Sequence, residues 1–152
     1  MKPKNRTIGA DLLYNLKHDK TMVHEFKKEW IISGITDPCI TFTENFGRHL
    51  KNGNFTTSQI RNVFGEIKRI QMSGFRNHKT DFLLLRPKMA YAAKRATDKD
   101  KNATGASDFE KVLKSAHEAV ASGTPDDEKR FENFCDFVEA VLAYHKAAGG
   151  RD

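Results

Sequence analysis

Basic side chains recur at seven-residue spacing in the middle of the chain. Arg61 and Lys68 form one such pair, and Lys88 and Arg95 form another with Tyr91 between them. Residues seven apart in a helix project from the same side, so each pair would form a basic ridge. Arginine suits phosphate because its planar guanidinium donates two hydrogen bonds at once. The spacing therefore indicates binding to a phosphate backbone.

A third pair, Lys79 and Arg86, extends this pattern, and the charge of the whole chain is polarised around it. Residues 56–105 carry eleven Lys or Arg against four Asp or Glu, an excess of +7, whereas residues 106–152 carry six against ten, or −4. A basic middle attracts polyanions such as nucleic acid, while the acidic end suits basic protein surfaces. A solvated helix face is the alternative explanation of such a charge run.

Two residues within these ridges have more than one interpretation. Gly65 lies between Arg61 and Lys68, where a glycine costs a helix about 1 kcal/mol. It permits close approach of another backbone, either that of a partner or that of a neighbouring helix in this chain. Tyr91 is suited to stacking on a base or bonding a phosphate or sugar oxygen, although the pattern favours a half-buried core position. No residues are arranged to read base edges, so we expect binding without sequence preference.

The sequence contains no motif of a catalytic or metal site. His-Glu-x-x-His, a phosphate-cradling glycine loop and Gly-x-Ser-x-Gly are all absent. The two cysteines, Cys39 and Cys135, lack metal-binding spacing, and we expect both to be reduced thiols. We therefore expect no enzymatic activity, no metal and no cofactor. No apolar stretch is long enough for a signal peptide or a membrane span, so we expect a cytoplasmic protein without a membrane partner.

Apolar residues follow helical spacing along most of the chain, and no strand-like alternation competes with it. This predicts an all-α, single-domain bundle of about five helices. A capping box at Thr56–Gln59 begins the second of them. Pro87 lies inside the third and deprives a carbonyl of its donor, so we expect a kink or a break near Leu83–Leu84. The predicted helices are Asp37–Lys51 with Asp37 as its cap, Ser58–Ser73, Asn77–Thr97, one from a Ser107 cap to a break at Gly123, and Asp126–Ala147.

Residues 1–35 form an N-terminal extension whose role the sequence does not indicate. Ala10–Lys17 and Val23–Ser33 are each compatible with a short helix, the second of which places Phe26 and Trp30 on one face. Residues 36–150 form the predicted helical bundle.

Three segments of the chain resemble the small helical subunit of type III-A (Csm-type) CRISPR–Cas interference complexes. They are Phe55–Asn62, Leu85–Arg95 and Phe131–His145, and the resemblance covers residues 36–150 in the same order and with similar spacing. It implies a non-enzymatic α-helical bundle, several copies of which stack along a filament-like complex. It also implies that the basic faces meet the target RNA paired with the guide RNA. The implied partners are these two RNAs, the backbone and large subunits, and adjacent copies of the same chain.

The resemblance places RNA-binding positions on six basic residues. These six expected RNA-binding residues are Arg61, Lys68, Arg69, Arg86, Lys88 and Arg95. One departure from the family pattern is Lys94, where the family often has glycine before the last arginine.

Two other functions are compatible with the residues: an architectural adaptor that binds acidic protein without touching RNA, and a small DNA-binding regulator with a helix-turn-helix.

Overall fold

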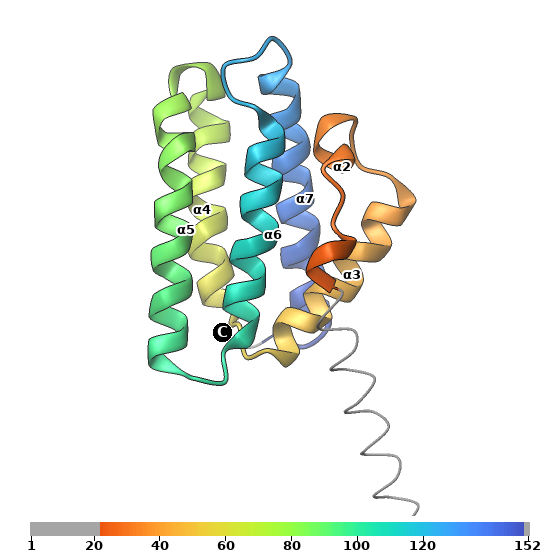
Figure 1. Cartoon of the computed structure of the whole chain (residues 1–152), viewed down its shortest axis with the longest axis vertical. Helices are drawn as coiled ribbons and strands as arrows, with labels where there is room; N and C mark the ends of the chain where they lie inside the picture. Colours follow the sequence, from red (N-terminus) through yellow and green to blue (C-terminus); the bar gives the residue numbers. More distant parts are fainter. Residues whose placement is uncertain (1–21, 151–152) are drawn as a thin grey trace, which may run out of the picture.

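The computed structural model describes residues 22–150 as a bundle of packed helices (Figure 1). Residues 22–25 are helical, and the described part of the chain contains no strand. The prediction of an all-α single domain is confirmed. No helix within residues 22–150 is both long enough and apolar enough to cross a bilayer. The further elements are α2 (Glu29–Ile32), α3 (Asp37–Asn52), α4 (Thr57–Ser73), the 3-10 helix η1 (Phe75–Asn77), α5 (Lys79–Lys99), α6 (Thr104–Val120) and α7 (Asp127–Ala147).

The five predicted helices correspond to α3 through α7, and α7 lies at the centre of the bundle. It contacts α2, α3, α4 and α6, so its apolar side chains are covered on several sides. Phe131, Phe134 and Phe137 are fully buried. Burying one such side chain contributes roughly 1.5–3 kcal/mol to the free energy of unfolding. The core of the bundle is therefore organised around α7.

Residues 22–35, the described part of the predicted N-terminal extension, pack against this core. Trp30 and Ile31 are buried, and the amide of Asn133 in α7 donates a hydrogen bond to the Ile31 carbonyl over 2.9 Å. The predicted helix Val23–Ser33 is interrupted, because residues 26–28 between its two helical parts are not helical. The predicted helix Ala10–Lys17 lies outside the described residues.

The starts of α3 and α4 depend on side-chain caps. The capping box is confirmed, since the backbone N–H of Gln59 donates to Thr56 Oγ1 over 3.2 Å and the backbone N–H of Thr56 donates to Gln59 Oε1 over 2.9 Å. The prediction of Asp37 as the cap of α3 is wrong. Thr36 takes this position, because its hydroxyl oxygen accepts the Cys39 N–H over 3.3 Å. Asp37 instead lies in the first turn, where its negative charge still favours the helix start.

α6 begins at Thr104, before the Ser107 cap that the sequence predicts, so this prediction is wrong. The Gly105 N–H donates to the Gly53 carbonyl over 3.0 Å, which satisfies a first-turn donor from the distant α3–α4 connection. Gly105 allows this contact because it has no side chain: a Cβ there would lie 2.9 Å from the Leu50 carbonyl oxygen. The helix start is thus stabilised by tertiary structure.

α5 continues through Pro87 without interruption. Proline has no N–H, so the carbonyl of Leu83 loses its intrahelical donor. The Leu83 residue is 52% exposed, and water can hydrogen-bond to a carbonyl on the solvent side of a helix. Of the two outcomes predicted near Leu83–Leu84, the break does not occur.

Candidate nucleic-acid interface

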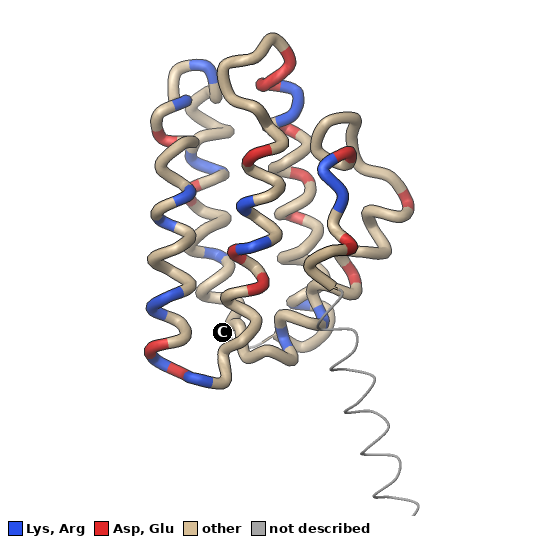
Figure 2. The backbone as a smooth tube through the Cα atoms, in the orientation of Figure 1, with Lys and Arg blue, Asp and Glu red and all other residues tan. Residues whose placement is uncertain are grey.

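α4 and α5 lie side by side and run in opposite directions (Figure 1). Gly74, with φ of +98°, ends α4, and η1 then leads into α5. Ile67 on α4 and Leu85 on α5 point into the core. Lys and Arg recur along both helices (Figure 2). The hairpin therefore holds the basic middle of the sequence on one packed pair of helices.

Glu66 connects two of the predicted residues across the contact between α4 and α5. Its carboxylate accepts hydrogen bonds from Arg69 over 3.1 Å and from Lys88 over 3.2 Å. These two hydrogen bonds hold the pKa of the Glu66 carboxyl below its usual value. Arg69 also reaches Asp81 on α5, with 3.8 Å between nitrogen and oxygen. The cations are oriented by these acids, and part of their charge is neutralised.

A hollow of about 550 Å³ lies between the start of α4 and the end of α5. Arg95 and Lys99 contribute its cationic groups, and Ser58 and Asn62 contribute hydroxyl and amide groups from α4. Asp100 is the acid in its lining. No ion pair joins Arg95 to an acid within residues 22–150. The hollow therefore offers hydrogen-bond donors suited to an anion.

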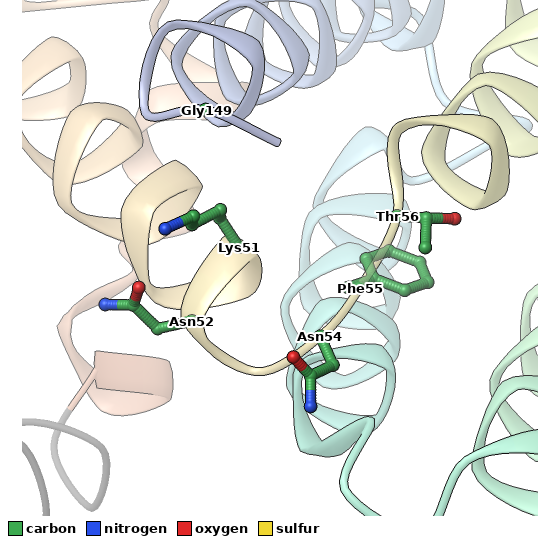
Figure 3. A pocket seen from close by; sticks show the side chains of 6 residues that line it. All are labelled: Lys51, Asn52, Asn54, Phe55, Thr56 and Gly149. Atoms are coloured by element: carbon green, nitrogen blue, oxygen red, sulfur yellow. The ribbon is translucent and has the colours of Figure 1, made fainter. Parts of the chain in front are cut away.

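A second hollow of about 430 Å³ adjoins the first, and the two share Asn54 and Thr56 in their linings. Figure 3 shows Lys51 and Asn52 at the end of α3, followed by Asn54, Phe55 and Thr56 on the connection to α4. Lys51 supplies a cationic side chain to its lining. This hollow extends the polar surface at the same end of the bundle.

The outer side of α5 between its basic residues is exposed and partly apolar. Tyr91 is 65% exposed and Leu84 is 45% exposed. The Arg95 guanidinium lies 5.7 Å from the centre of the Tyr91 ring, within the range of a cation–π contact. The half-buried core position expected for Tyr91 is therefore wrong. Its ring is available for contact with another molecule.

Arg86 lies on the other side of α5, toward α6. Its Nε donates a hydrogen bond over 3.1 Å to Nδ1 of His117, a buried residue of α6. Arg86 also lines a hollow of about 340 Å³ between the two helices, together with Glu110 and Lys114. Arg86 and Lys88 thus flank the exposed side of α5 on opposite sides.

The remaining predicted residues lie on other parts of α4. Arg61 is exposed. Lys68 is half-buried, and its ammonium lies 5.6 Å from the centre of the Phe64 ring. It is also close enough to α7 to act electrostatically on Asp136. Gly65 has nothing within 4 Å of the position that a Cβ would occupy, so close packing of a neighbouring helix in the described chain does not explain this glycine.

A comparison with protein families identifies the chain. A model of the family described as Csm2 Type III-A matches residues 37–151, about three-quarters of the sequence. The chain belongs to the Csm2 family. The resemblance inferred from the sequence is thereby confirmed. Neither the curated proteins nor the solved structures that were searched give a match.

Csm2 proteins of this type are non-catalytic structural subunits, and this Csm2 chain is accordingly a structural subunit of a multi-subunit type III-A CRISPR complex. Its structure groups Arg69, Lys88 and Arg95 along the contact between α4 and α5. It does not bring Lys68 or Arg86 to that contact, since they face α7 and α6.

Sequence reasoning misses several polar residues that the Csm2 fold adds to this surface. Ser58 and Asn62 have no charge, and their approach to Arg95 depends on how α4 and α5 pack. Lys99 lies four residues after Arg95, so the helical repeat was a usable signal for it. A search for basic ridges also misses His117, which is a buried residue of α6 that contacts Arg86 from behind the surface.

Part of the acidic end of this Csm2 chain is used within the fold. Lys79 pairs with buried Asp127 over 2.9 Å, and Arg76 pairs with Glu128 over 2.8 Å. These pairs attach the start of α7 to the α4–α5 hairpin. Lys79, which belonged to a predicted basic ridge, therefore has a structural partner at its ammonium group.

Proposed function

We propose that this subunit binds the duplex of guide RNA and target RNA in the assembled type III-A complex, with the exposed side of α5 and its two flanks against the RNA. The observation that carries the proposal is the position of Arg95, which borders a solvent-open hollow with Ser58 and Asn62. Lys88 lies seven residues earlier, or about 10 Å along the helix axis at 1.5 Å per residue. The two residues and Arg69 provide a basic surface along α4 and α5, and Arg86 extends it across α5.

The chemistry of this surface suits an RNA backbone. Phosphate oxygens accept hydrogen bonds, and the surface presents guanidinium, ammonium, hydroxyl and amide donors around the Tyr91 ring. Gly65 has no side chain, so the backbone of α4 is accessible to a partner on the exposed side. Arg61 adds charge nearby, while Lys68 contributes mainly through its longer-range field. Binding of this kind follows the backbone and shape of a duplex and leaves sequence reading to base pairing.

The same proposal includes protein partners. Copies of this chain and the backbone and large subunits would contact the sides of the bundle away from α5, where Asp136 and Glu139 on α7 are exposed. We expect an assembly that contains guide RNA to lie in the cytoplasm. We expect no catalytic role for the subunit in this assembly.

The test compares assembled complexes that contain Arg95→Ala or Lys129→Ala. Lys129 is exposed in the first turn of α7 and does not line the hollow. The start of α7 and the end of α5 lie at opposite ends of the bundle (Figure 1), so this variant removes one charge away from the proposed surface. We expect Arg95→Ala to weaken duplex binding and to reduce the slope of log K against log salt by about 0.7–0.9 for each lost phosphate contact. The Arg61→Ala, Lys88→Ala double variant should weaken duplex binding more than Arg95→Ala does, without unfolding the subunit.

Equal affinities and equal salt slopes for Arg95→Ala and Lys129→Ala would contradict the proposal. Competition separates the adaptor function from RNA binding, because an adaptor keeps its protein partner at RNA concentrations that saturate an RNA-binding surface. A protected site at one DNA sequence would instead support a DNA-binding regulator.

A further inference from the structure

His117 makes two hydrogen bonds to one turn of α5. The residue is 2% exposed, and its ring stacks on the Phe82 ring with 3.9 Å between centroids and an angle of 4° between planes. Nε2 lies 2.6 Å from the Phe82 carbonyl oxygen, and Nδ1 lies 3.1 Å from Nε of Arg86. A buried side chain of α6 therefore holds both the backbone and a cationic side chain of α5.

The partners of His117 determine its protonation. A carbonyl oxygen only accepts, so Nε2 must carry a hydrogen, and Arg86 Nε only donates, so Nδ1 must be unprotonated. Both conditions are met by one neutral form of the ring. Burial lowers the pKa of His117, and the charge of Arg86 acts in the same direction. The neutral ring thus gives the Arg86 guanidinium an acceptor that adds no opposite charge.

This contact orients Arg86 without neutralising it. The two cations at the contact between α4 and α5 behave differently, since Arg69 and Lys88 share the carboxylate of Glu66. His117 occupies only the Nε–H of Arg86, so the two terminal amino groups keep their donors. Arg86 has no acidic partner in an ion pair within the described residues. The next residue is Pro87, which removes a backbone hydrogen bond from this part of α5, so a side-chain anchor here holds a weakened turn.

We propose that His117 is a positioning residue for RNA binding: it holds the Arg86 guanidinium in one orientation so that its terminal amino groups face the phosphate backbone. The inference rests on the proposed function. An anchored arginine loses less rotamer freedom when it binds than a free one, because part of that freedom is already lost in the folded subunit. Removing the anchor should therefore weaken duplex binding through Arg86 alone.

The test is a double-mutant cycle in the assembled complex, with duplex affinity as the readout. It uses the unmodified subunit, His117→Gln, Arg86→Ala and the double variant. We expect His117→Gln to weaken binding by about threefold to tenfold when Arg86 is present, and to have no effect when Arg86 is already alanine. An equal loss in both backgrounds would mean that His117 is merely structural and would overturn the inference, as would no loss in either.

A second variant keeps His117 and the buried core intact. Arg86→Lys preserves the charge, but the single ammonium group of lysine cannot donate to His117 and also donate two parallel hydrogen bonds to a phosphate. We expect it to bind the duplex about threefold to tenfold less tightly, and unchanged affinity would overturn the inference. If Arg86→Ala itself leaves affinity unchanged while Arg95→Ala weakens it, the role of Arg86 fails and the proposed function of the α4–α5 surface remains supported. If neither Arg86→Ala nor Arg95→Ala weakens duplex binding, both the inference about His117 and the proposed function are contradicted.

Discussion

Alanine substitutions at two helical glycines are expected to change stability in opposite directions. Gly47 in α3 lies against α7, where a Cβ would stand 2.6 Å from the backbone nitrogen of His145 and 2.8 Å from the carbonyl carbon of Tyr144. Gly65 in α4 has nothing within 4 Å of the same position. Both glycines lie inside helices, so the two substitutions share their effect on helix propensity. Only the tertiary surroundings differ.

The size of each effect follows from these distances. Non-bonded carbon atoms prefer a separation of about 3.5–4.0 Å, so α3 and α7 would have to separate by about 1 Å to admit the methyl group at Gly47. Overpacking costs about 1–3 kcal/mol, and the upper half applies because the opposing atoms are mostly backbone. Alanine improves a helix interior by about 1 kcal/mol relative to glycine. Gly47→Ala should therefore lose about 1–2 kcal/mol of unfolding free energy, and Gly65→Ala should gain about 1 kcal/mol.

Urea unfolding of the isolated subunit, followed by circular dichroism, measures both changes. A difference of 1 kcal/mol corresponds to about 2–4 °C in Tm for a domain of this size, so thermal unfolding provides a second readout. Stabilisation by both variants would refute the close approach of α3 and α7 at Gly47. Destabilisation by Gly65→Ala would refute the open surroundings of that glycine.

Three further predictions concern the cap of α4, the buried histidines and the exposed glycine. Thr56→Ala removes the acceptor of the Gln59 N–H and should cost about 1 kcal/mol in urea unfolding, whereas Ser58→Ala at the neighbouring exposed position should cost less. Burial lowers the pKa values of His117 and His145, so the unfolded chain binds more protons than the folded one as the pH falls below their ordinary value of 6.5. The unfolding free energy should therefore fall between pH 7.5 and pH 5.5, and His117→Gln should make this fall shallower; a rise toward pH 5.5 would contradict the assignment of both rings as neutral. Gly65→Ala should weaken duplex binding in the assembled complex although it stabilises the isolated subunit, and unchanged affinity would show that no partner approaches α4 at this point.

The helices are largely predictable from local signals. Apolar residues such as Ile60 and Ile67 repeat at helical spacing, and the Thr56–Gln59 box marks a start without any tertiary information. The start of α6 is not predictable in this way, because its first-turn donor at Gly105 is satisfied by the Gly53 carbonyl from a distant connection. The exposure of Tyr91 is not predictable either. Its position in the helical repeat does not indicate which side of α5 is left uncovered by α4 and α6.

At the binding surface, what the sequence determines differs more clearly from what the tertiary structure determines. The sequence alone determined that the middle of the chain is helical and basic and that Lys88 and Arg95 share one side of a helix, because charge and a seven-residue repeat are local properties. Only the tertiary structure decided that Arg86 faces α6 and is anchored by His117. A helical repeat defines the angle between two side chains about one axis. Their neighbours depend on how the buried stripes of all the helices pack together, and that packing is a property of the whole core.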